Sequence, residues 1–416
     1  MPGTAEVAAG TLRVVMVVPG FPKLSETFIV GKFLGLLDAG FDVRVVCARS
    51  DPAEWSRFPA LDERPGVRER VLVGPPSRPR WRAGSHVPGA YARSVRDAPG
   101  ATGRYLVRRG ARGVRGLYLD AGIVRARPDL LHFEFGTLAL GRTYLREALG
   151  CRLVVSFRGF DLNFAGLETP GYFNEVWAAV DGVHVLGEDL WARALRRGCP
   201  SDVPHALIPP AVDVSRFDPG PPRRAEVMGT PHRPLRLLSV GRLEWKKGYE
   251  FALQAVGLLR DRGLTVDYRI VGEGVHLEAV AFCRRQLELD DCVTLVGSLA
   301  PDDVGRELLW CDVFLHAAVS EGFCNAVMEA QAMKVPVVCS DADGLPENVD
   351  DGVTGSVVPR RDPVAMADAV ARLAGDPGLR ARMGAAGRQR VAQRFRPADA
   401  IAAFGRFYRQ VMSHGN

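Results

Sequence analysis

The sequence predicts an α/β protein with two Rossmann-like domains that face a cleft. In each half of the chain, short β-branched runs bounded by turn residues alternate with segments of helical length, the pattern of βαβ units in a parallel sheet. A stretch rich in proline and polar residues separates the two series. The length of 416 residues allows two or three domains at about 150 residues each.

The first half carries five predicted strands. They are expected at 12–18, 43–47, 130–133, 153–157 and 183–186. A helix is predicted at about 27–39, where Gly40 ends it. Residues 51–116 are rich in Pro, Gly and Arg, and we interpret them as a surface insertion that is partly helical between 88 and 116.

The second half repeats the pattern. Its predicted strands lie at 235–240, 268–271, 293–296, 313–316 and 335–339. Its predicted helices lie at about 248–262, 275–289, 301–311 and 325–333, followed by a helical tail at 363–413 with breaks at Gly375-Asp-Pro and at Pro397.

These elements predict a domain division. We expect an N-terminal domain at 1–205, a linker at 206–234, a C-terminal domain at 235–395 and a terminal helix at 396–416 that packs back on the N-terminal domain. Open parallel sheets bind ligands at the carboxyl ends of their strands. The cleft between the two domains is therefore the expected site.

The composition excludes several classes of protein. Hydrophobic residues make up 47% and charged residues 25% of the chain, which rules out global disorder. No run of about 18 apolar residues predicts a membrane-spanning helix, and the first ten residues lack the features of a signal peptide. The eight cysteines include no CxxC pair, so we expect reduced thiols, a cytoplasmic location and no zinc ribbon.

One segment accounts for the basic character of the chain. Residues 64–115 contain 13 arginines and two acidic residues, a net charge of +11, whereas the whole chain carries +6. A solvated arginine-rich surface is the simpler interpretation. The alternative is contact with an anionic membrane, which would place the protein at the inner face of the membrane. We expect no nucleic-acid partner.

Two familiar nucleotide motifs are missing. No G-x-G-x-x-G follows the first strand, and the later Gly272-Glu273-Gly274 lacks the third glycine because position 277 is Leu. No G-x-x-x-x-G-K-[ST] occurs either. A dinucleotide dehydrogenase and a P-loop enzyme are therefore disfavoured.

Two predicted loops carry charged residues that could bind a substrate. In the first, Arg242 and Lys247 lie in a strand-to-helix turn, where they could flank a pyrophosphate. In the second, Glu321 and Glu329 stand eight residues apart around a glycine turn, and Asn325 is the expected N-cap of the following helix. Carboxylates accept strong hydrogen bonds from sugar and ribose hydroxyls.

Together these segments resemble family 4 of the retaining glycosyltransferases, which have the GT-B fold. The resemblance runs through SVGRLEWKKG, IVGEG, VTLVG, CDVFLHAAVSEGFCNAVMEAQAMKVPVVCSDADGLPENV and DGVTG, nearly the whole second half. The first half is similar through VPG after the first strand and through FPKLSETF, which resembles exopolysaccharide transferases of this family.

The resemblance implies a role for each matching residue. Arg242 and Lys247 match the pair that holds the donor diphosphate, and Glu321 matches the glutamate that faces the transferred sugar. The implied donor-binding residues are Gly20, Val296, Gly297, Gly322, Phe323, Cys324, Asn325 and Glu329. The N-terminal domain is implied to bind the acceptor.

The N-terminal half, which is implied to bind the acceptor, departs from the family's sequence pattern. Arg158 stands where the family usually has a histidine, and we expect it on the cleft rim, oriented by Asp161. His132 and Glu134 occupy the position of a common histidine pair, and His132 is either close to the acceptor or a hydrogen-bonded residue at a strand end.

The expected reaction is transfer of a sugar from a nucleotide sugar to a hydroxyl acceptor, with retention. The acceptor classes are a glycan, a lipid-linked glycan or a small-molecule natural product. The resemblance implies no metal and no cofactor, and a UDP-sugar is the commonest donor. Two alternatives stay open: a GT-B sugar phosphorylase and a non-catalytic scaffold that binds sugar nucleotides.

Overall fold

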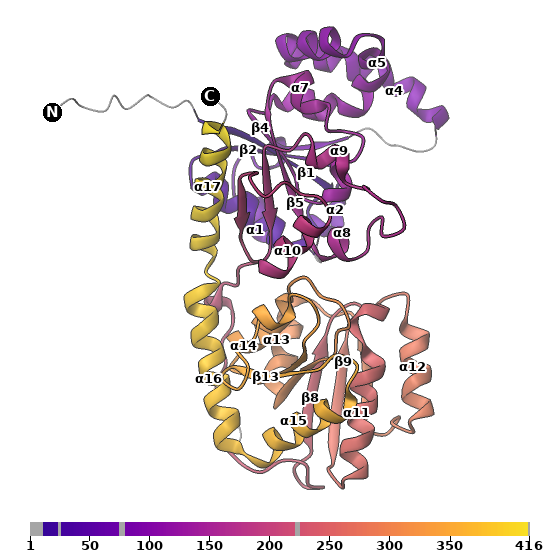
Figure 1. Cartoon of the computed structure of the whole chain (residues 1–416), viewed down its shortest axis with the longest axis vertical. Helices are drawn as coiled ribbons and strands as arrows, with labels where there is room; N and C mark the ends of the chain where they lie inside the picture. The colour runs from indigo at the N-terminus through magenta and orange to yellow at the C-terminus, as the bar shows by residue number, and fades with distance from the viewer. Residues whose placement is uncertain (1–10, 24–25, 75–79, 221–224, 415–416) are drawn as a thin grey trace, which may run out of the picture. The chain divides into compact units, whose positions relative to one another are not determined.

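The structure is a computed structural model that describes residues 11–23, 26–74, 80–220 and 225–414, without the side chains of residues 80–86. The chain divides into two compact units. Unit 1 comprises Met1–Leu186, Trp191–Ile208 and Ala398–Asn416, and unit 2 comprises Gly187–Leu190 and Pro209–Pro397. Each unit has a parallel sheet covered by helices, as the sequence predicts (Figure 1).

Unit 1 is built on a seven-stranded sheet in the order β3-β2-β1-β4-β5-β6-β7. All five predicted strands are present. β3 and β7 were not predicted, because each has only three residues, too few to form a recognisable apolar run. The strands are β1 (Arg13–Gly20), β2 (Asp42–Arg49), β3 (Val71–Val73), β4 (Leu130–Phe133), β5 (Arg152–Phe157), β6 (Gly182–Val185) and β7 (His205–Leu207).

The helices of this part of the chain include the predicted one and several short ones. They are α1 (Thr27–Asp38), α2 (Pro52–Trp55), α3 (Pro59–Asp62), α4 (Arg80–Asp97), α5 (Pro99–Ala126), α6 (Gly136–Ala139), α7 (Leu145–Leu149), α8 (Gly159–Asn163), α9 (Asn174–Trp177) and α10 (Glu188–Arg196), with a 3₁₀ turn at Arg68–Arg70. The insertion is more helical than predicted, since α4 and α5 cover most of 80–126. Buried Tyr105 and Leu117 anchor α5, which has a kink at Gly110.

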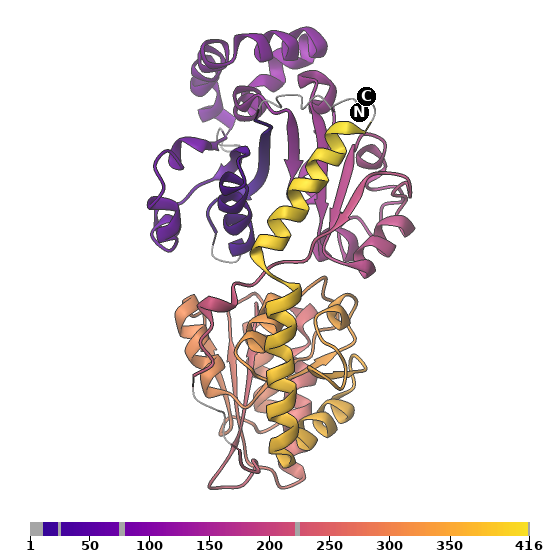
Figure 2. The same cartoon turned by 90° about the vertical axis from the view of Figure 1, so that its left-hand side faces the viewer.

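The terminal helix α17 (Pro397–Ser413) packs within unit 1, where it lies across the strands of the sheet (Figure 2). Phe404, Phe407 and Tyr408 are buried in the same apolar cluster as Phe33 of α1. Gly35 lets α17 lie close to α1, because a Cβ on Gly35 would lie 2.5 Å from the side chain of Ile401.

Unit 2 has a six-stranded sheet in the order β10-β9-β8-β11-β12-β13. The strands are β8 (Leu235–Val240), β9 (Val266–Val271), β10 (Val293–Gly297), β11 (Val313–His316), β12 (Val337–Ser340) and β13 (Gly355–Val358), of which β13 was not predicted. The helices are α11 (Tyr249–Asp261), α12 (Leu277–Gln286), α13 (Pro301–Trp310), α14 (Asn325–Ala332), α15 (Pro363–Gly375) and α16 (Pro377–Arg394), with 3₁₀ turns at Val214–Arg216, Trp245–Lys247 and Leu345–Glu347.

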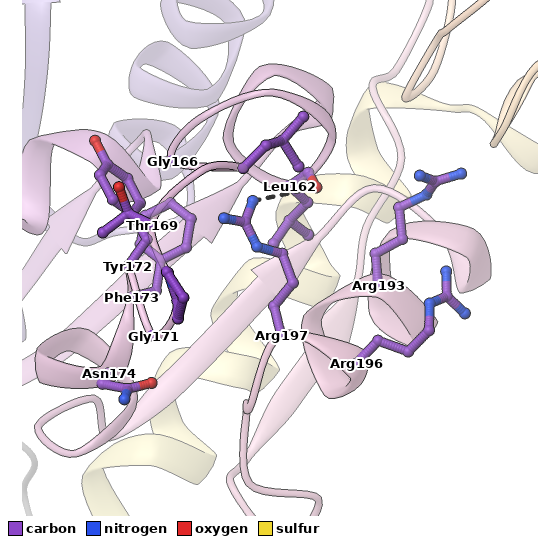
Figure 3. A pocket seen from close by; sticks show the side chains of 12 residues that line it. Leu162, Gly166, Thr169, Gly171, Tyr172, Phe173, Asn174, Arg193, Arg196 and Arg197 are labelled. Carbon is purple, nitrogen blue, oxygen red and sulfur yellow. Dashed lines mark hydrogen bonds between the residues drawn. The ribbon is translucent and has the colours of Figure 1, made fainter.

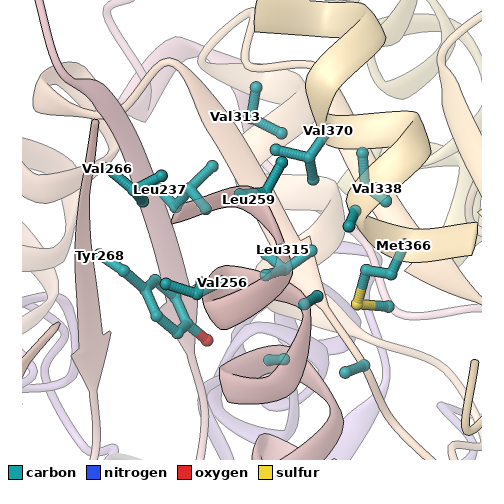
Figure 4. Close-up of a cluster of buried hydrophobic side chains, with 14 of the residues drawn as sticks. Leu237, Val256, Leu259, Val266, Tyr268, Val313, Leu315, Val338, Met366 and Val370 are labelled. Atoms are coloured by element: carbon teal, nitrogen blue, oxygen red, sulfur yellow. The ribbon is translucent and has the colours of Figure 1, made fainter. Parts of the chain in front are cut away.

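One of the buried apolar clusters of unit 2 lies between its sheet and the pair α11 and α15 (Figure 4), and another packs against α13 and α14. Leu237 and Leu315 from neighbouring strands meet Val256 of α11 and Val370 of α15, and all four side chains are fully buried. This packing fixes the strand ends from which the site loops leave the sheet.

The predicted linker at 206–234 is not a separate segment. From Pro209 onward its described residues belong to unit 2, because the Val212 N–H donates to the Phe395 carbonyl (2.9 Å) and Met228 is buried in the core. Unit 2 also includes Gly187–Leu190, since the Glu347 carboxylate accepts from the Glu188 N–H (3.0 Å).

Candidate active site

Two loops of unit 2 meet at the carboxyl edge of its sheet. One follows β8 and the other follows β11, and these strands are neighbours in the sheet. The carbonyl of Lys246 in the first loop accepts from the N–H of Val319 (2.8 Å) and of Ser320 (3.3 Å) in the second. The two motifs singled out in the sequence are therefore joined by backbone hydrogen bonds.

Glycines allow this close approach. Gly248 has a φ of 62°, and a Cβ there would lie 2.1 Å from the Ala317 carbonyl oxygen. A Cβ on Gly272 would lie 2.0 Å from the carbonyl oxygen of Gly241. The Gly272-Glu273-Gly274 motif thus packs against the first loop, which explains these glycines without a dinucleotide.

Arg242 and Lys247 have different environments. The Lys247 side chain is 12% exposed, and its ammonium group contacts the Glu321 carboxylate. The Arg242 side chain is 62% exposed and pairs with Glu244 at 2.7 Å. One cation is thus fixed inside the site, and the other lies on its surface.

The Glu321 carboxylate lies between two cations. Besides Lys247, the Nε2 atom of His316 lies 3.3 Å from Glu321 Oε2. Burial would raise the pKa of Glu321, but Lys247 and His316 outweigh burial and lower that pKa to about 2. Glu321 is therefore ionised near neutral pH, as an acceptor of sugar hydroxyls must be.

His316 was missed by the sequence reasoning. Burial lowers its pKa, but Cys324 as a thiolate and the Glu321 carboxylate raise it to about 9. The signal was available, because His316 ends a predicted strand at the carboxyl edge of a parallel sheet.

The N-terminus of α14 completes the second loop. Its N-cap is Cys324 and not Asn325, which is already the first helical residue, so that prediction was wrong. The Asn348 side chain holds the N-cap in place, accepting from the Cys324 N–H and donating to the Cys324 carbonyl, both at 3.2 Å. The Asp343 carboxylate similarly accepts from the N–H of Glu321 (3.2 Å).

The loop residues whose backbone N–H groups precede α14 are tightly packed. Gly322 is buried, and a Cβ on Gly344 would lie 2.3 Å from the Gly322 carbonyl oxygen. The Phe323 ring meets Phe395 edge to face, with centroids 5.7 Å apart. Asp343 and Asn348 were not singled out from the sequence, although both lie within the stretch that resembles the family.

The remaining predicted donor residues of unit 2 lie at the same sheet edge or in α14. Val296 and Gly297 end β10, and the Gly297 carbonyl accepts from the Gly272 N–H (2.8 Å). Glu329 lies on α14, where burial raises its pKa and the charge of Arg216 lowers it less. Arg216 is a further cation that the sequence reasoning missed.

His316, Glu321 and Cys324 are the described residues that could ligate a metal ion, since their ligand atoms lie within 4.8 Å of one another. This set already has a cation, because Lys247 contacts Glu321. Lys247 and a metal ion would compete for the same carboxylate.

In unit 1, Arg158 has a different partner from the one predicted. Its guanidinium donates to the side chain of Glu134 and to the Glu134 carbonyl, both at 3.1 Å, and it lies over the Phe28 ring. Asp161 does not orient the guanidinium, because its carboxylate accepts from the backbone N–H groups of Arg158 and Thr137 (3.0 Å each). Arg158 is the N-cap of α8, and 12% of its side chain is exposed.

His132 is not on a rim, because it is fully buried. Its Nδ1 atom lies 2.7 Å from the Tyr408 hydroxyl of α17, and its Nε2 atom lies 2.7 Å from the Ser156 hydroxyl. Burial, with Lys32 and Arg158 nearby, holds its pKa well below the usual value. His132 is therefore a neutral, hydrogen-bonded residue in β4, the structural alternative considered above.

Gly20 ends β1 at the carboxyl edge of the unit 1 sheet. An added Cβ there would make only an ordinary contact, 3.5 Å from the Arg49 carbonyl oxygen. Packing within unit 1 therefore does not require a glycine here, and the role of Gly20 in donor binding stays a prediction.

The sequence also matches known proteins at the residues that build this site. Residues 223–390 match the family described as glycosyl transferases group 1. Over 372 residues, the chain is 30% identical to WcaL of Escherichia coli K12, which is named for colanic acid biosynthesis; the match covers 84% of this chain and 88% of WcaL. The chain belongs to the group 1 glycosyltransferases.

Other similarities agree with this assignment. The amylovoran biosynthesis glycosyltransferase AmsK of Erwinia amylovora is 26% identical over 85% of this chain and 88% of its own length. The structure of Anabaena Alr3699/HepE in complex with UDP-glucose is similar with a TM-score of 0.70 at 14% identity, over 96% of this chain and all of that one. The chain has the predicted GT-B fold, and its resemblance to exopolysaccharide-type glycosyltransferases is confirmed.

Proposed function

We propose that this glycosyltransferase moves a sugar from a UDP-sugar to a hydroxyl acceptor with retention of anomeric configuration. The observation that carries the proposal is the meeting of Lys247, Glu321 and the N-terminus of α14 at one sheet edge. A fixed cation, a helix N-terminus and an ionised carboxylate suit a diphosphate and a sugar bound side by side.

The site has the charges that departure of the diphosphate requires. As the bond from the anomeric carbon to the diphosphate oxygen breaks, Lys247, Arg242 and the amides before α14 stabilise the developing negative charge. The acceptor oxygen bonds to the anomeric carbon on the same face, and its proton passes to the departing phosphate oxygen. No protein base is then needed, and Glu321 orients the sugar hydroxyls.

These side chains supply positive charge without a metal ion, so we propose a metal-independent reaction. The choice of UDP is supported by similar folds solved with UDP-sugars, such as Alr3699/HepE. An acceptor in exopolysaccharide assembly is supported by the names of WcaL and AmsK.

The test is to incubate the protein with UDP-, GDP- and ADP-sugars and a panel of saccharide acceptors, and to determine the product's anomeric configuration by NMR. The proposal expects UDP release and an α-linked product from an α-linked donor. A β-linked product would contradict retention. Sugar 1-phosphate formed from a glycan and inorganic phosphate would instead identify a phosphorylase, and donor binding without turnover would identify a scaffold.

We also propose that the basic segment 64–115 lies against an anionic membrane at the inner face. Arg104, Arg112 and Arg115 of α5 are exposed and have no ion pair with another described residue, and Val107 is 83% exposed among them. Other arginines support the simpler surface interpretation, since Arg64, Arg68, Arg70 and Arg96 pair with aspartates. No helix in the described ranges has the length and apolar character needed to cross a membrane.

A further inference from the structure

Three side chains of the candidate active site bring together the ligand types of a transition-metal site. His316 ends β11, Glu321 lies in the loop that follows, and Cys324 is the N-cap of α14. Each offers one ligand atom, and these three atoms lie within 4.8 Å of one another. His316 and Cys324 are each 4% exposed, so the set is largely shielded from water.

The spacing of these atoms is close to that of a tetrahedral zinc site. Zinc bonds of about 2.0–2.3 Å at tetrahedral angles put neighbouring ligand atoms about 3.3–3.8 Å apart. The Nε2 atom of His316 and the Oε2 atom of Glu321 are already 3.3 Å apart. A shift of about 1 Å by the Cys324 side chain would therefore complete the set.

The backbone holds both ends of this set in place. β11 lies between β8 and β12 in the sheet, which fixes the position of His316. The Asn348 side chain fixes Cys324, because it accepts from the Cys324 N–H and donates to the Cys324 carbonyl, both at 3.2 Å. A metal ion would therefore meet ligands that the fold has already brought together.

The ligand types select among metal ions. Thiolate and imidazole ligands suit Zn²⁺, whereas Mg²⁺ and Mn²⁺ prefer carboxylates, carbonyls and water. The thiolate of Cys324 and the carboxylate of Glu321 carry two negative charges, which balance one Zn²⁺ ion. Three protein ligands leave the fourth tetrahedral position to water.

We propose that His316, Glu321 and Cys324 bind Zn²⁺ and that the bound ion blocks the donor site. Binding takes the Glu321 carboxylate from Lys247, whose ammonium group contacts it. Lys247 can turn away, because its ammonium group is a point charge on a flexible four-carbon chain. The protons of His316 and Cys324 pass to solvent, since metal ligands must be deprotonated.

The blocking part of the inference rests on the proposed function, in which Lys247 and Glu321 face the diphosphate and the sugar. The zinc ion would hold Glu321 and displace Lys247, so it would remove both from the donor. An ion balanced by two anionic ligands carries little net charge and does not replace the lysine cation. The Lys247 and Glu321 side chains are 12% and 13% exposed, which leaves an approach from solvent.

Other parts of the described chain do not offer a comparable set. The hollow beside α8 in unit 1, which Figure 3 shows, is lined by residues that include no histidine, cysteine or carboxylate. Cys283 of α12 is partly exposed, but it belongs to no such group of ligands among the described residues. Cys283→Ser is therefore the matched control for the loss of a thiol.

The test measures Zn²⁺ affinity by calorimetry in a nitrilotriacetate buffer, which keeps the free zinc concentration constant when a nucleotide is added. Co²⁺ is the spectroscopic probe, because cobalt bound to a thiolate has a charge-transfer absorption band. The full-length protein is compared with Cys324→Ser, His316→Gln, Lys247→Met and the control Cys283→Ser. Thermal melting confirms that each variant is folded.

We expect one Zn²⁺ per chain at this site and a thiolate-to-cobalt band that Cys324→Ser removes. Cys324→Ser and His316→Gln should each weaken zinc binding at least about 10-fold, because even indirect partners of a metal contribute about 10–100-fold. Lys247→Met should bind zinc at least about 10-fold more tightly, because the competing cation is gone. Cys283→Ser should match the parent protein.

Three results would overturn the metal site: no zinc binding, no thiolate-to-cobalt band, or unchanged affinity in both Cys324→Ser and His316→Gln. Unchanged or weaker affinity in Lys247→Met would overturn the displacement of the lysine. Mg²⁺ that binds as tightly as Zn²⁺ would overturn the choice of metal.

UDP release from a UDP-sugar is measured on the same samples at fixed free zinc. At a free Zn²⁺ concentration of about ten times its Kd, the KM for the UDP-sugar should rise about 10-fold, as competition requires. Zinc that binds without changing this KM would overturn the blocking part. If the protein releases UDP but binds no zinc, only the metal inference fails. If zinc binds at these residues but no nucleotide sugar binds or reacts, the proposed function fails and the metal site stands.

Discussion

Lys247 and Glu321 form a largely buried ion pair, although they lie 74 positions apart in the chain. The pairing follows from the fold, because Lys247 follows β8, Glu321 follows β11, and these strands are neighbours. A cation held by a fixed carboxylate is oriented before the donor arrives, so little reorganisation is needed when charge develops on the diphosphate.

Replacing Lys247 by Met should reduce transfer by about 10²–10³-fold, because one fixed positive charge facing the leaving group is lost. Breaking the buried pair should also cost about 3 kcal/mol of unfolding free energy, since Glu321 keeps only His316 as a cationic neighbour. The double variant Lys247→Met/Glu321→Gln separates the two effects. Urea unfolding should show stability largely restored, while UDP release stays low. Restored activity in the double variant would mean that Lys247 serves only to neutralise Glu321.

The Glu321 carboxylate should make stability depend on pH. Its pKa is lowered to about 2 in the folded protein, below its ordinary value of 4.5. The stabilisation is therefore fully present above pH 4.5 and is lost as the pH falls toward 2, and the whole effect is about 3 kcal/mol. Between pH 6 and pH 3, about 2 kcal/mol of it should be lost. Urea unfolding of the parent and of Glu321→Gln measures this, and a pH-independent difference between the two would contradict the ion pair.

Gly248→Ala should damage the donor site. The new Cβ would lie 2.1 Å from the Ala317 carbonyl oxygen, and the φ of 62° strains any other residue. We expect a loss of about 1–3 kcal/mol in stability and weaker UDP binding. The matched control is Gly257→Ala in α11, where a Cβ meets nothing within 4 Å and helix propensity should rise. Calorimetry showing equal UDP affinity in both variants would argue against close contact between the two loops.

Arg158→Ala should lower the melting temperature by several degrees. The substitution removes the hydrogen bonds to the buried Glu134, but Lys32 still contacts that carboxylate, so the protein should fold. Removing one partner of a buried pair typically costs about 3 kcal/mol. Arg158→Lys should recover part of the stability. If the folded Ala variant keeps full turnover, Arg158 has only this structural role and does not bind the substrate.

The membrane proposal predicts salt-sensitive binding to anionic vesicles. Each basic residue near such a surface contributes about 1 kcal/mol, so Arg104→Gln/Arg112→Gln/Arg115→Gln should lose most vesicle binding in a flotation assay at low salt. Arg285→Gln in unit 2 is the control. Equal flotation with anionic and neutral vesicles would leave the solvated-surface interpretation alone.

Much of this architecture could be predicted from the sequence, because the strands and helices depend on patterns of neighbouring residues. The ten predicted strands stand out as apolar runs bounded by turn residues, whereas the missed strands β3, β7 and β13 lie at the edges of their sheets and have only three or four residues. The loops around Lys247 and Glu321 could be found because each follows a predicted strand.

What could not be predicted depends on contacts between distant residues. The Arg158 guanidinium pairs with Glu134 from the neighbouring strand end, although Asp161 is nearer in sequence. His132 is buried by Tyr408, which lies 276 positions away. Cys324 becomes the N-cap because Asn348 holds its backbone, a contact that no local pattern contains.

The most direct test of the central claim is the rate of UDP release from a UDP-sugar by the parent protein and by Lys247→Met, with UDP affinity measured by calorimetry on the same samples. The account predicts that the parent binds UDP and releases it from at least one UDP-sugar, and that the variant is slower by about 10²–10³-fold with weakened UDP binding. A folded variant with the parent's rate and affinity would contradict the assignment of the diphosphate to this sheet edge.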